Sequence, residues 1–366
     1  MMHFEELKNP YTLQFSFIPP KFIERTRVTN EIIGNFIRDV PTYRGIFITG
    51  VRGSGKTVIL GEIRNRIRNM ENWISIDLNP ESNLIDSLAR GLYLIPELKA
   101  LFVNTKLDFS VLGIGVHMEN PELVASNEED ALKMMLNALK KFNKKVLVTI
   151  DEVTYSNDVA RFSHALSSYA GENYDIYVLM TGLKENIKVI KNQKSLTFLY
   201  RAGVKELDGL NITAICSDYQ KTMDISRELA EDMAYCTKGY SLAFQALGYH
   251  YWNALSHADK PEDINVSDVY EQLDITLAEL AYDKIWDELS ANDKKVLTII
   301  KELSSQGQGA SVKVEDVRKK ADMNSNTFTT YRTRLLDSGV VDGSQYGYLS
   351  IKLPRFDKYI DTEQMF

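Results

Sequence analysis

The sequence predicts an α/β fold: a parallel sheet, then a helical region, then a small C-terminal domain of helices and a hairpin. Short apolar runs alternate with longer helical patterns over residues 41–208. This alternation is typical of parallel strands that are joined by crossover helices. Over residues 209–288 only helical spacing is present. Residues 290–360 follow the order helix, helix, helix and two short strands, which is typical of a winged helix.

Five apolar runs are the predicted strands of the sheet, and the more apolar of them indicate strands buried on both faces. The five runs are residues 45–49, 73–77, 146–150, 176–180 and 204–207. A helix is predicted over residues 58–70, directly after the first strand. The stretch 106–116 predicts an inserted β-hairpin or strand.

Proline and glycine residues interrupt the helical and strand patterns, and their positions predict that the chain has four parts. These are an N-terminal arm (1–40), an α/β domain (41–208), a helical domain (209–288) and a winged-helix domain (289–366).

Length and charge narrow the function classes. The chain has 366 residues and a formal net charge of −7, which argues against a general nucleic-acid coat. No apolar stretch approaches the roughly 18 residues that span a bilayer, and the first residues lack the pattern of a signal peptide. Cys216 and Cys236 are the only cysteines. We therefore expect a reduced, cytoplasmic protein with no membrane partner.

A glycine-rich loop carries the strongest chemical signal. Residues 50–57 read Gly-Val-Arg-Gly-Ser-Gly-Lys-Thr, which fits the phosphate-binding pattern Gly-x-x-x-x-Gly-Lys-Ser/Thr between a predicted strand and a helix. In such a loop the backbone N–H groups and the helix N-terminus face phosphates. Lys56 is predicted to reach the β- and γ-phosphates, and the Thr57 hydroxyl to ligate Mg²⁺. The predicted phosphate-binding residues are Gly50, Arg52, Gly53, Ser54, Gly55, Lys56, Thr57 and Val58.

Two carboxylates follow the buried strand 146–150. Asp151 is placed to hold the metal, directly or through its water, and Glu152 to act as a general base on the attacking water. The following strand ends near Thr181, a candidate contact for the γ-phosphate or that water; the alternative is a local backbone hydrogen bond. Arg201 is a candidate for stabilising the transferring phosphoryl group, in its own chain or in a neighbouring subunit. The alternative is a surface or structural arginine.

The C-terminal helices predict a second interaction site. The run Ser290-Ala291-Asn292-Asp293 is predicted to open the first of them with capping residues, and Asn324 or Ser325 to cap the third. The third helix would present side chains to a DNA major groove. These side chains are Asn326, Thr327, Thr330, Arg332 and Arg334. Residues 290–366 hold 12 basic and 10 acidic residues, a weak excess, so a protein-binding winged helix is the alternative.

With these motifs in place, the chain resembles bacterial and archaeal ATPases of the AAA+ superfamily, close to the origin-recognition and STAND-type groups. The motifs that carry the resemblance are Asn9-Pro10-Tyr11, Pro19-Pro20, Ile23-Glu24-Arg25, residues 50–57, Ile150-Asp151-Glu152, Leu179 to Gly182, Lys238 to Ser241, Gln245 to Gly248 and Leu353 to Phe356.

The resemblance implies a helical lid over the nucleotide at residues 209–288 and an adenine-flanking segment that includes Ile23 and Arg25. Two positions depart from the family pattern: Glu24 stands where the family has glycine, and Ser241 where it has proline. The expectation is an ATPase that uses ATP or ADP with Mg²⁺ and is coupled to a DNA-binding winged helix. The alternative is a nucleotide-gated switch with little turnover that binds a protein effector or a second copy of itself.

Overall fold

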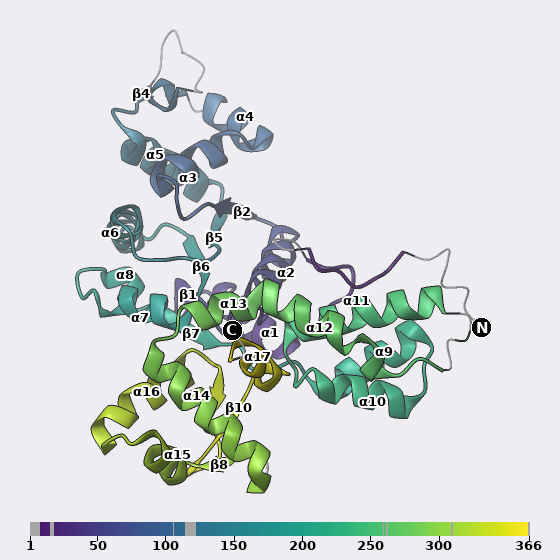
Figure 1. The fold of residues 1–366 in the computed structure, drawn as a ribbon. Coiled ribbons are helices and arrows are strands. Elements are labelled where there is room, and N and C mark those ends of the chain that lie inside the picture. Colours follow the sequence, from purple (N-terminus) through teal and green to yellow (C-terminus); the bar gives the residue numbers. More distant parts are fainter. Residues whose placement is uncertain are drawn as a thin grey trace. The chain divides into compact units, whose positions relative to one another are not determined.

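The computed structural model describes residues 8–14, 18–104, 106–113, 122–258, 260, 263–308 and 310–364. Two compact units make up the chain. The sheet unit comprises residues 26–49 and 56–206, and the helical unit comprises residues 1–25, 50–55 and 207–366. Figure 1 labels the helices and strands of each unit.

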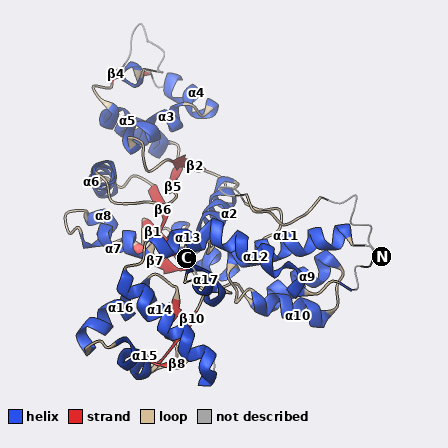
Figure 2. Cartoon of the chain, in the orientation of Figure 1, coloured by secondary structure: helices blue, strands red, loops and turns tan. Residues whose placement is uncertain are grey.

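The sheet unit is built on five parallel strands in the order β2-β5-β6-β1-β7. Their bounds are β1 (Gly45–Thr49), β2 (Trp73–Leu78), β5 (Lys145–Ile150), β6 (Ile176–Gly182) and β7 (Gly203–Glu206). The predicted strands are all present: the run 45–49 matches β1, and the other four differ from the observed bounds by one or two residues at one or both ends. Strand β6 lies between β1 and β5 (red in Figure 2), and Thr49 pairs with Gly182 while Ile150 pairs with Met180. The carboxyl ends of β5, β6 and β1 therefore meet at one edge of the sheet.

The sheet unit also contains helices with buried apolar residues. They are α1 (Thr26–Phe36), α2 (Lys56–Arg68), α3 (Leu84–Tyr93), α4 (Pro96–Asn104), α5 (Glu128–Lys141), α6 (Asn157–Gly171), α7 (Lys184–Asn192) and α8 (Thr197–Tyr200). Helix α2 packs against β2, β5 and β6. Strands β5 and β6 are buried almost throughout, which explains their uninterrupted apolar sequences.

The predicted insertion differs in detail from the structure. Strand β3 (Leu107–Asp108) pairs in parallel with β4 (Leu123–Val124), so these strands do not form an antiparallel hairpin. A 3₁₀ turn over Ser110–Leu112 follows β3 and buries Leu112. Apolar spacing cannot separate these outcomes, because a strand and a short helical turn can bury the same side chains. Part of the stretch, residues 114–116, lies outside the described residues.

The helical unit has one continuous apolar core. Its helices up to the C-terminal region are α9 (Ile212–Met223), α10 (Arg227–Cys236), α11 (Ser241–His257), α12 (Tyr270–Leu277) and α13 (Asp283–Asp287). The N-terminal arm joins this core through Tyr11, whose hydroxyl donates to Asp218 over 2.8 Å. Gly248 is required beside it, because a Cβ there would lie 2.6 Å from the Tyr11 ring.

The C-terminal region contains the predicted helices and hairpin and adds two elements. Its elements are α14 (Ala291–Leu303), β8 (Val312–Lys313), α15 (Val314–Ala321), α16 (Ser325–Asp337), β9 (Val341–Asp342), β10 (Tyr348–Ile351) and α17 (Phe356–Glu363). The antiparallel sheet has the order β8-β10-β9. The predicted caps are confirmed: Ser290 and Asp293 form a capping box, and Asn324 accepts from Thr327 N–H. Strand β8 and helix α17 are not predicted, because two residues and eight residues give little periodicity.

In the part of the chain that the structure describes, no helix is both long and apolar enough to cross a membrane.

Candidate functional site

The glycine-rich loop adopts a backbone that only glycine tolerates easily. Gly53 and Gly55 have φ of 74° and 88°, in the left-handed region. A Cβ on Gly53 would also lie 2.2 Å from the Tyr240 hydroxyl. The backbone conformation therefore requires glycine at both positions. At Gly53 a larger residue would also collide with Tyr240.

Three successive carbonyls of the loop accept hydrogen bonds from residues 240–242, which we call the anchor segment. The Tyr240 hydroxyl donates to Arg52 O (2.6 Å), Leu242 N–H to Gly53 O (3.1 Å), and Ser241 Oγ to Ser54 O (2.9 Å). The sequence does not predict this contact. Nothing local signals it, because the two segments lie almost 190 residues apart.

Arg25 also binds the loop backbone. Its guanidinium donates to the carbonyls of Ser54 (3.0 Å) and Asp208 (2.9 Å). Ile23, the other residue implied at the adenine, packs on the core of the helical unit. Arg25 thus contacts two main-chain carbonyls, one of which belongs to the loop, and it also donates to the Ser241 Oγ over 3.5 Å.

Two other loop residues contact the C-terminal half of the helical unit. Arg52 pairs with Glu288 over 3.0 Å. Val51 lies beside Gly339, where an added Cβ would stand 3.2 Å from the Val51 Cβ. The loop is therefore in direct contact with the residues that flank α14 and β9.

The sheet unit brings four predicted residues together at the carboxyl end of β5. The Thr57 hydroxyl, in the first turn of α2, donates to Asp151 Oδ2 over 2.7 Å. The Thr181 hydroxyl, on β6, donates to Asp151 Oδ1. It also accepts from the Glu152 N–H over 3.0 Å. Thr181 is fully buried, so in this structure its hydroxyl positions the two acidic residues.

Glu152 has a left-handed backbone, with φ of 52°. This conformation is costly for a residue with a side chain and is common at functional sites. Its N–H is fixed by Thr181 and by Asp151 Oδ1 (3.2 Å), while its side chain is exposed. The main chain of Glu152 is therefore fixed and its carboxylate accessible to water.

Lys56 and Val58 occupy the first turn of α2, where N–H groups have no acceptor within the helix. The Lys56 side chain is buried, with 7 % exposed. Lys56 and Val58 therefore lie at the N-terminus of α2, where the helix dipole favours anions.

Arg201 follows α8 and is exposed. Its side chain makes no hydrogen bond or ion pair with any residue that the structure describes. The structure therefore does not bring it together with the other four residues.

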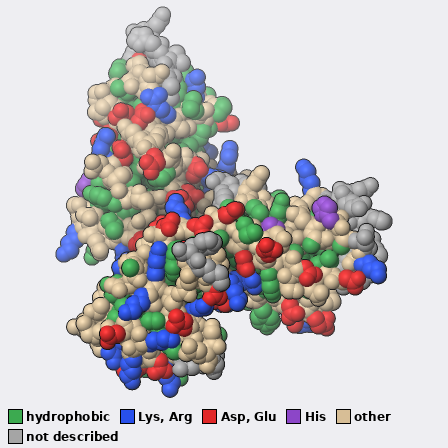
Figure 3. Space-filling view, viewed as in Figure 1, with side chains coloured by type: hydrophobic (Ala, Val, Ile, Leu, Met, Phe, Trp, Pro, Cys, Tyr) green, Lys and Arg blue, Asp and Glu red, His purple; other side chains and the backbone are tan. Residues whose placement is uncertain are grey.

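The predicted DNA-facing residues of α16 differ in their surroundings. Asn326 and Thr330 are exposed. Arg334 pairs over 2.9 Å with the fully buried Asp293, which gives it a structural partner. Arg332 is half-buried, and its Nε lacks a partner among the described residues. In Figure 3 the visible face of this region shows basic and acidic side chains interspersed.

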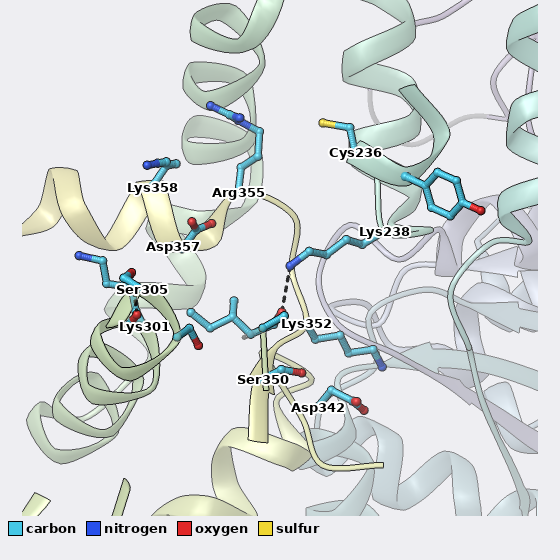
Figure 4. A pocket seen from close by; sticks show the side chains of 14 residues that line it. Cys236, Lys238, Lys301, Ser305, Asp342, Ser350, Lys352, Arg355, Asp357 and Lys358 are labelled. Atoms are coloured by element: carbon cyan, nitrogen blue, oxygen red, sulfur yellow. Dashed lines mark hydrogen bonds between the residues drawn. The ribbon is translucent and has the colours of Figure 1, made fainter. Parts of the chain in front are cut away.

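A pocket of about 680 Å³ lies in the helical unit between the end of α10 and the C-terminal elements. Lys238 extends into it and donates to Ile351 O over 3.1 Å (Figure 4). Lys352 and Lys358 extend in different directions in this view, and Arg355 is held by Asp274. The cations of the pocket thus do not converge on one point.

The donor set around Asp151 fits Mg²⁺ and no metal that needs a complete protein cage. Among the described residues, no group of three or more His, Cys, Asp or Glu side chains is placed to hold a metal. Mg²⁺ usually takes one or two protein oxygens and completes its shell with water and substrate phosphates. The Thr57 hydroxyl and the Asp151 carboxylate supply such oxygens.

Comparisons with known proteins place this architecture in a fold class. The chain is similar to the Walker-type ATPase PABY2304 of Pyrococcus abyssi, with a TM-score of 0.62, 13% identity, and 98% of this chain and 100% of that chain covered. It is also similar to the ORC2 protein of Aeropyrum pernix, solved in ADPNP–ADP complexes, with a TM-score of 0.59, 12% identity and 96% and 98% coverage. At these identities the likeness shows the fold alone: a P-loop nucleoside triphosphatase sheet of the AAA+ type.

The family model of a domain of unknown function, DUF8462, matches residues 279–360. A comparison with curated protein sequences finds no significant match.

Proposed function

We propose that this protein binds ATP and ADP with Mg²⁺ and hydrolyses ATP. The observation that carries the proposal is the contact between Thr57 and Asp151. It joins the last residue of the Gly-x-x-x-x-Gly-Lys-Thr loop to the carboxylate after β5 over 2.7 Å. A hydroxyl and a carboxylate at this spacing are the oxygens that hold Mg²⁺ beside the β- and γ-phosphates in P-loop enzymes.

Each residue then has a defined role. Lys56 and the N–H groups of the loop bind the phosphates, and Thr57 and Asp151 hold the metal. Bound Mg²⁺ would supply charge stabilisation at the phosphate oxygens. Glu152 accepts a proton from the water that attacks the γ-phosphorus, and the bond to the oxygen bridging to the β-phosphate breaks. Thr181 holds Asp151 and Glu152 in position.

Arg201 is the proposed source of further positive charge during phosphoryl transfer. It is exposed and has no partner among the described residues, so its side chain is available to a nucleotide. That nucleotide belongs either to its own chain or to a second copy.

The nucleotide state is proposed to act on the winged-helix domain, residues 289–366. Support comes from the loop itself, because Val51 lies beside Gly339 and Arg52 pairs with Glu288. A change in loop conformation on nucleotide binding would alter both contacts. The proposed ligand of the winged helix is duplex DNA, contacted by Asn326, Thr330 and Arg332 of α16.

A second candidate function is a nucleotide-gated switch whose winged helix binds a protein. Internal ion pairing favours it, because several cations of this region already face acids. The pairs are Arg318 and Lys319 with Glu315, Lys320 with Glu302, and Arg334 with Asp293. Fewer unpaired cations leave fewer contacts for DNA phosphates.

Phosphate release measured with Mg²⁺ and with EDTA tests the enzymatic proposal. We expect Mg²⁺-dependent turnover that Glu152→Gln lowers by about 100- to 10,000-fold, the range for losing a general base. The exposed Glu71, in the loop before β2, supplies the control variant Glu71→Gln. Wild-type protein that binds ATP but releases no phosphate would favour the switch. Salt-dependent duplex binding that Arg332→Ala weakens would support the DNA proposal.

A further inference from the structure

The anchor segment is the feature of the helical unit that the proposed mechanism does not use. Tyr240 is 6 % exposed, and its ring lies in the core near Tyr282, with ring centroids 6.3 Å apart. Its hydroxyl donates to Arg52 O. Burial raises the pKa of Tyr240, so the hydroxyl remains a neutral donor.

Peptide geometry links these contacts to phosphate binding. A trans peptide is planar, so the carbonyl of one residue and the N–H of the next point in opposite directions. Holding the carbonyls of Arg52, Gly53 and Ser54 on one side therefore turns the N–H groups of residues 53–55 to the other side. The Ser54 N–H is used within the loop, on Val51 O at 3.1 Å. The N–H groups of Gly53 and Gly55 are thus the two that the anchor segment orients.

The donors of the anchor segment are themselves well fixed. Ser241 is the first residue of α11, and Leu242 N–H belongs to its first turn, where no carbonyl of the helix can accept it. The loop carbonyl at Gly53 therefore satisfies a donor that would otherwise be unpaired. Gly239, just before, has φ of 73°, and a Cβ there would lie 2.7 Å from Leu210 O. The Leu210 N–H donates to Gly239 O over 2.7 Å, which holds the start of α11 against residues 209–210.

We infer that Tyr240 and Ser241 are positioning residues for nucleotide binding: they hold the glycine-rich loop in its phosphate-binding conformation through the carbonyls of Arg52 and Ser54. The inference rests on the proposed function. It also gives Ser241 a role in place of the proline expected from the resemblance, because proline at the first helical position keeps the helix but carries no hydroxyl.

Without these hydrogen bonds the loop samples other conformations, and nucleotide binding must then also order the loop. The apparent Kd rises by the inverse of the fraction of molecules with a competent loop. Loss of one hydrogen bond of ordinary strength corresponds to a Kd about 3- to 10-fold weaker.

The test compares Tyr240→Phe and Ser241→Ala with wild-type protein. The Kd values of ADP and of ATP with Mg²⁺ are measured by calorimetry, and amide hydrogen exchange of residues 50–57 is measured without nucleotide. We expect a Kd about 3- to 10-fold weaker for each variant and faster exchange in the loop, with the thermal midpoint of nucleotide-free protein lowered only slightly. Ser241→Thr keeps a hydroxyl and is expected to restore both values.

Two control variants remove the same hydroxyl groups from a tyrosine and a serine elsewhere in the helical unit. Tyr235→Phe removes the hydroxyl of a tyrosine that is 67 % exposed, and Ser305→Ala removes an exposed hydroxyl that donates to Lys301 O over 3.0 Å. Both should bind nucleotide like wild type. If the wild-type protein binds nucleotide and both Tyr240→Phe and Ser241→Ala bind it with the same Kd, this inference is overturned but the proposed function is not. Absence of nucleotide binding by wild-type protein would instead overturn the proposed function.

Discussion

The glycine-rich loop and the residues around Asp151 are held in different ways. In the sheet unit, the hydroxyls of Thr57 and Thr181 both donate to the Asp151 carboxylate, and the three side chains stand at the ends of neighbouring elements. In the helical unit, Arg25 and the anchor segment hold the loop 50–55 through its main-chain carbonyls. The side chains proposed to act on the metal are thus fixed by one another, within the sheet unit. The loop backbone proposed to bind phosphate is instead fixed through its carbonyls, within the helical unit.

The largest effect on metal binding is expected in the sheet unit, from Asp151→Asn. This change removes the negative charge that would hold Mg²⁺ and weakens the acceptor of both threonine hydroxyls. We expect the Mg²⁺ concentration for half-maximal turnover to rise by at least about 10- to 100-fold. A Mg²⁺ titration of phosphate release measures it, with Asp158→Asn as the control in α6. Unchanged Mg²⁺ dependence would show that Asp151 does not serve the metal.

Thr181→Val separates positioning from direct contact. The change keeps the shape of a fully buried side chain but removes the hydroxyl that bonds Asp151 and the Glu152 N–H. We expect kcat to fall about 10-fold with little change in KM, and the free energy of unfolding to fall by about 1–3 kcal/mol. Thr181→Ser should recover most of the activity. A variant that loses ATP affinity while keeping kcat would instead indicate that Thr181 contacts the nucleotide.

Arg334→Ala tests the stability of the helical unit at a residue outside the proposed nucleotide site. Asp293 is fully buried and would lose its cation. We expect the free energy of unfolding to fall by about 1–3 kcal/mol in urea denaturation, while phosphate release stays unchanged. Lys313→Ala, an exposed cation of β8, is the control. If Arg334→Ala is as stable as wild type, the ion pair with Asp293 does not stabilise the fold, and Arg334 is again a candidate DNA contact.

The smallest expected effect is the pH dependence from His250. Burial lowers the pKa of His250, and its Nε2 lies 2.7 Å from Thr276 Oγ1. Its neutral imidazole form is favoured in the folded state, so its contribution to stability is present above the unfolded pKa of about 6.5 and is lost as pH falls. Thermal unfolding between pH 7 and pH 5 should show a shallower pH dependence in His250→Gln than in wild type. An equal slope would exclude this contribution.

The kind of contact involved also explains which features of the fold and of the site can be predicted from the sequence. The strands, the loop and the acidic pair follow from local patterns, because a buried strand and a phosphate loop each need particular residues at fixed spacing. The contact of Tyr240 with Arg52 O does not, because it joins two backbone segments that only the folded chain brings together. The Arg334–Asp293 pair has the same character: the sequence predicts one residue as a DNA contact and the other as a cap, but their pairing needs the packing of α16 on α14.

Calorimetric titration of ATP with Mg²⁺ into wild-type protein and Lys56→Ala tests the central claim most directly. Lys56 is the buried cation at the end of the loop, and its loss removes charge-assisted hydrogen bonds to phosphate. We predict one nucleotide per chain for the wild type and a Kd about 10- to 100-fold weaker for Lys56→Ala. Equal affinity of the two proteins, or no binding by the wild type at saturating nucleotide, would contradict this claim.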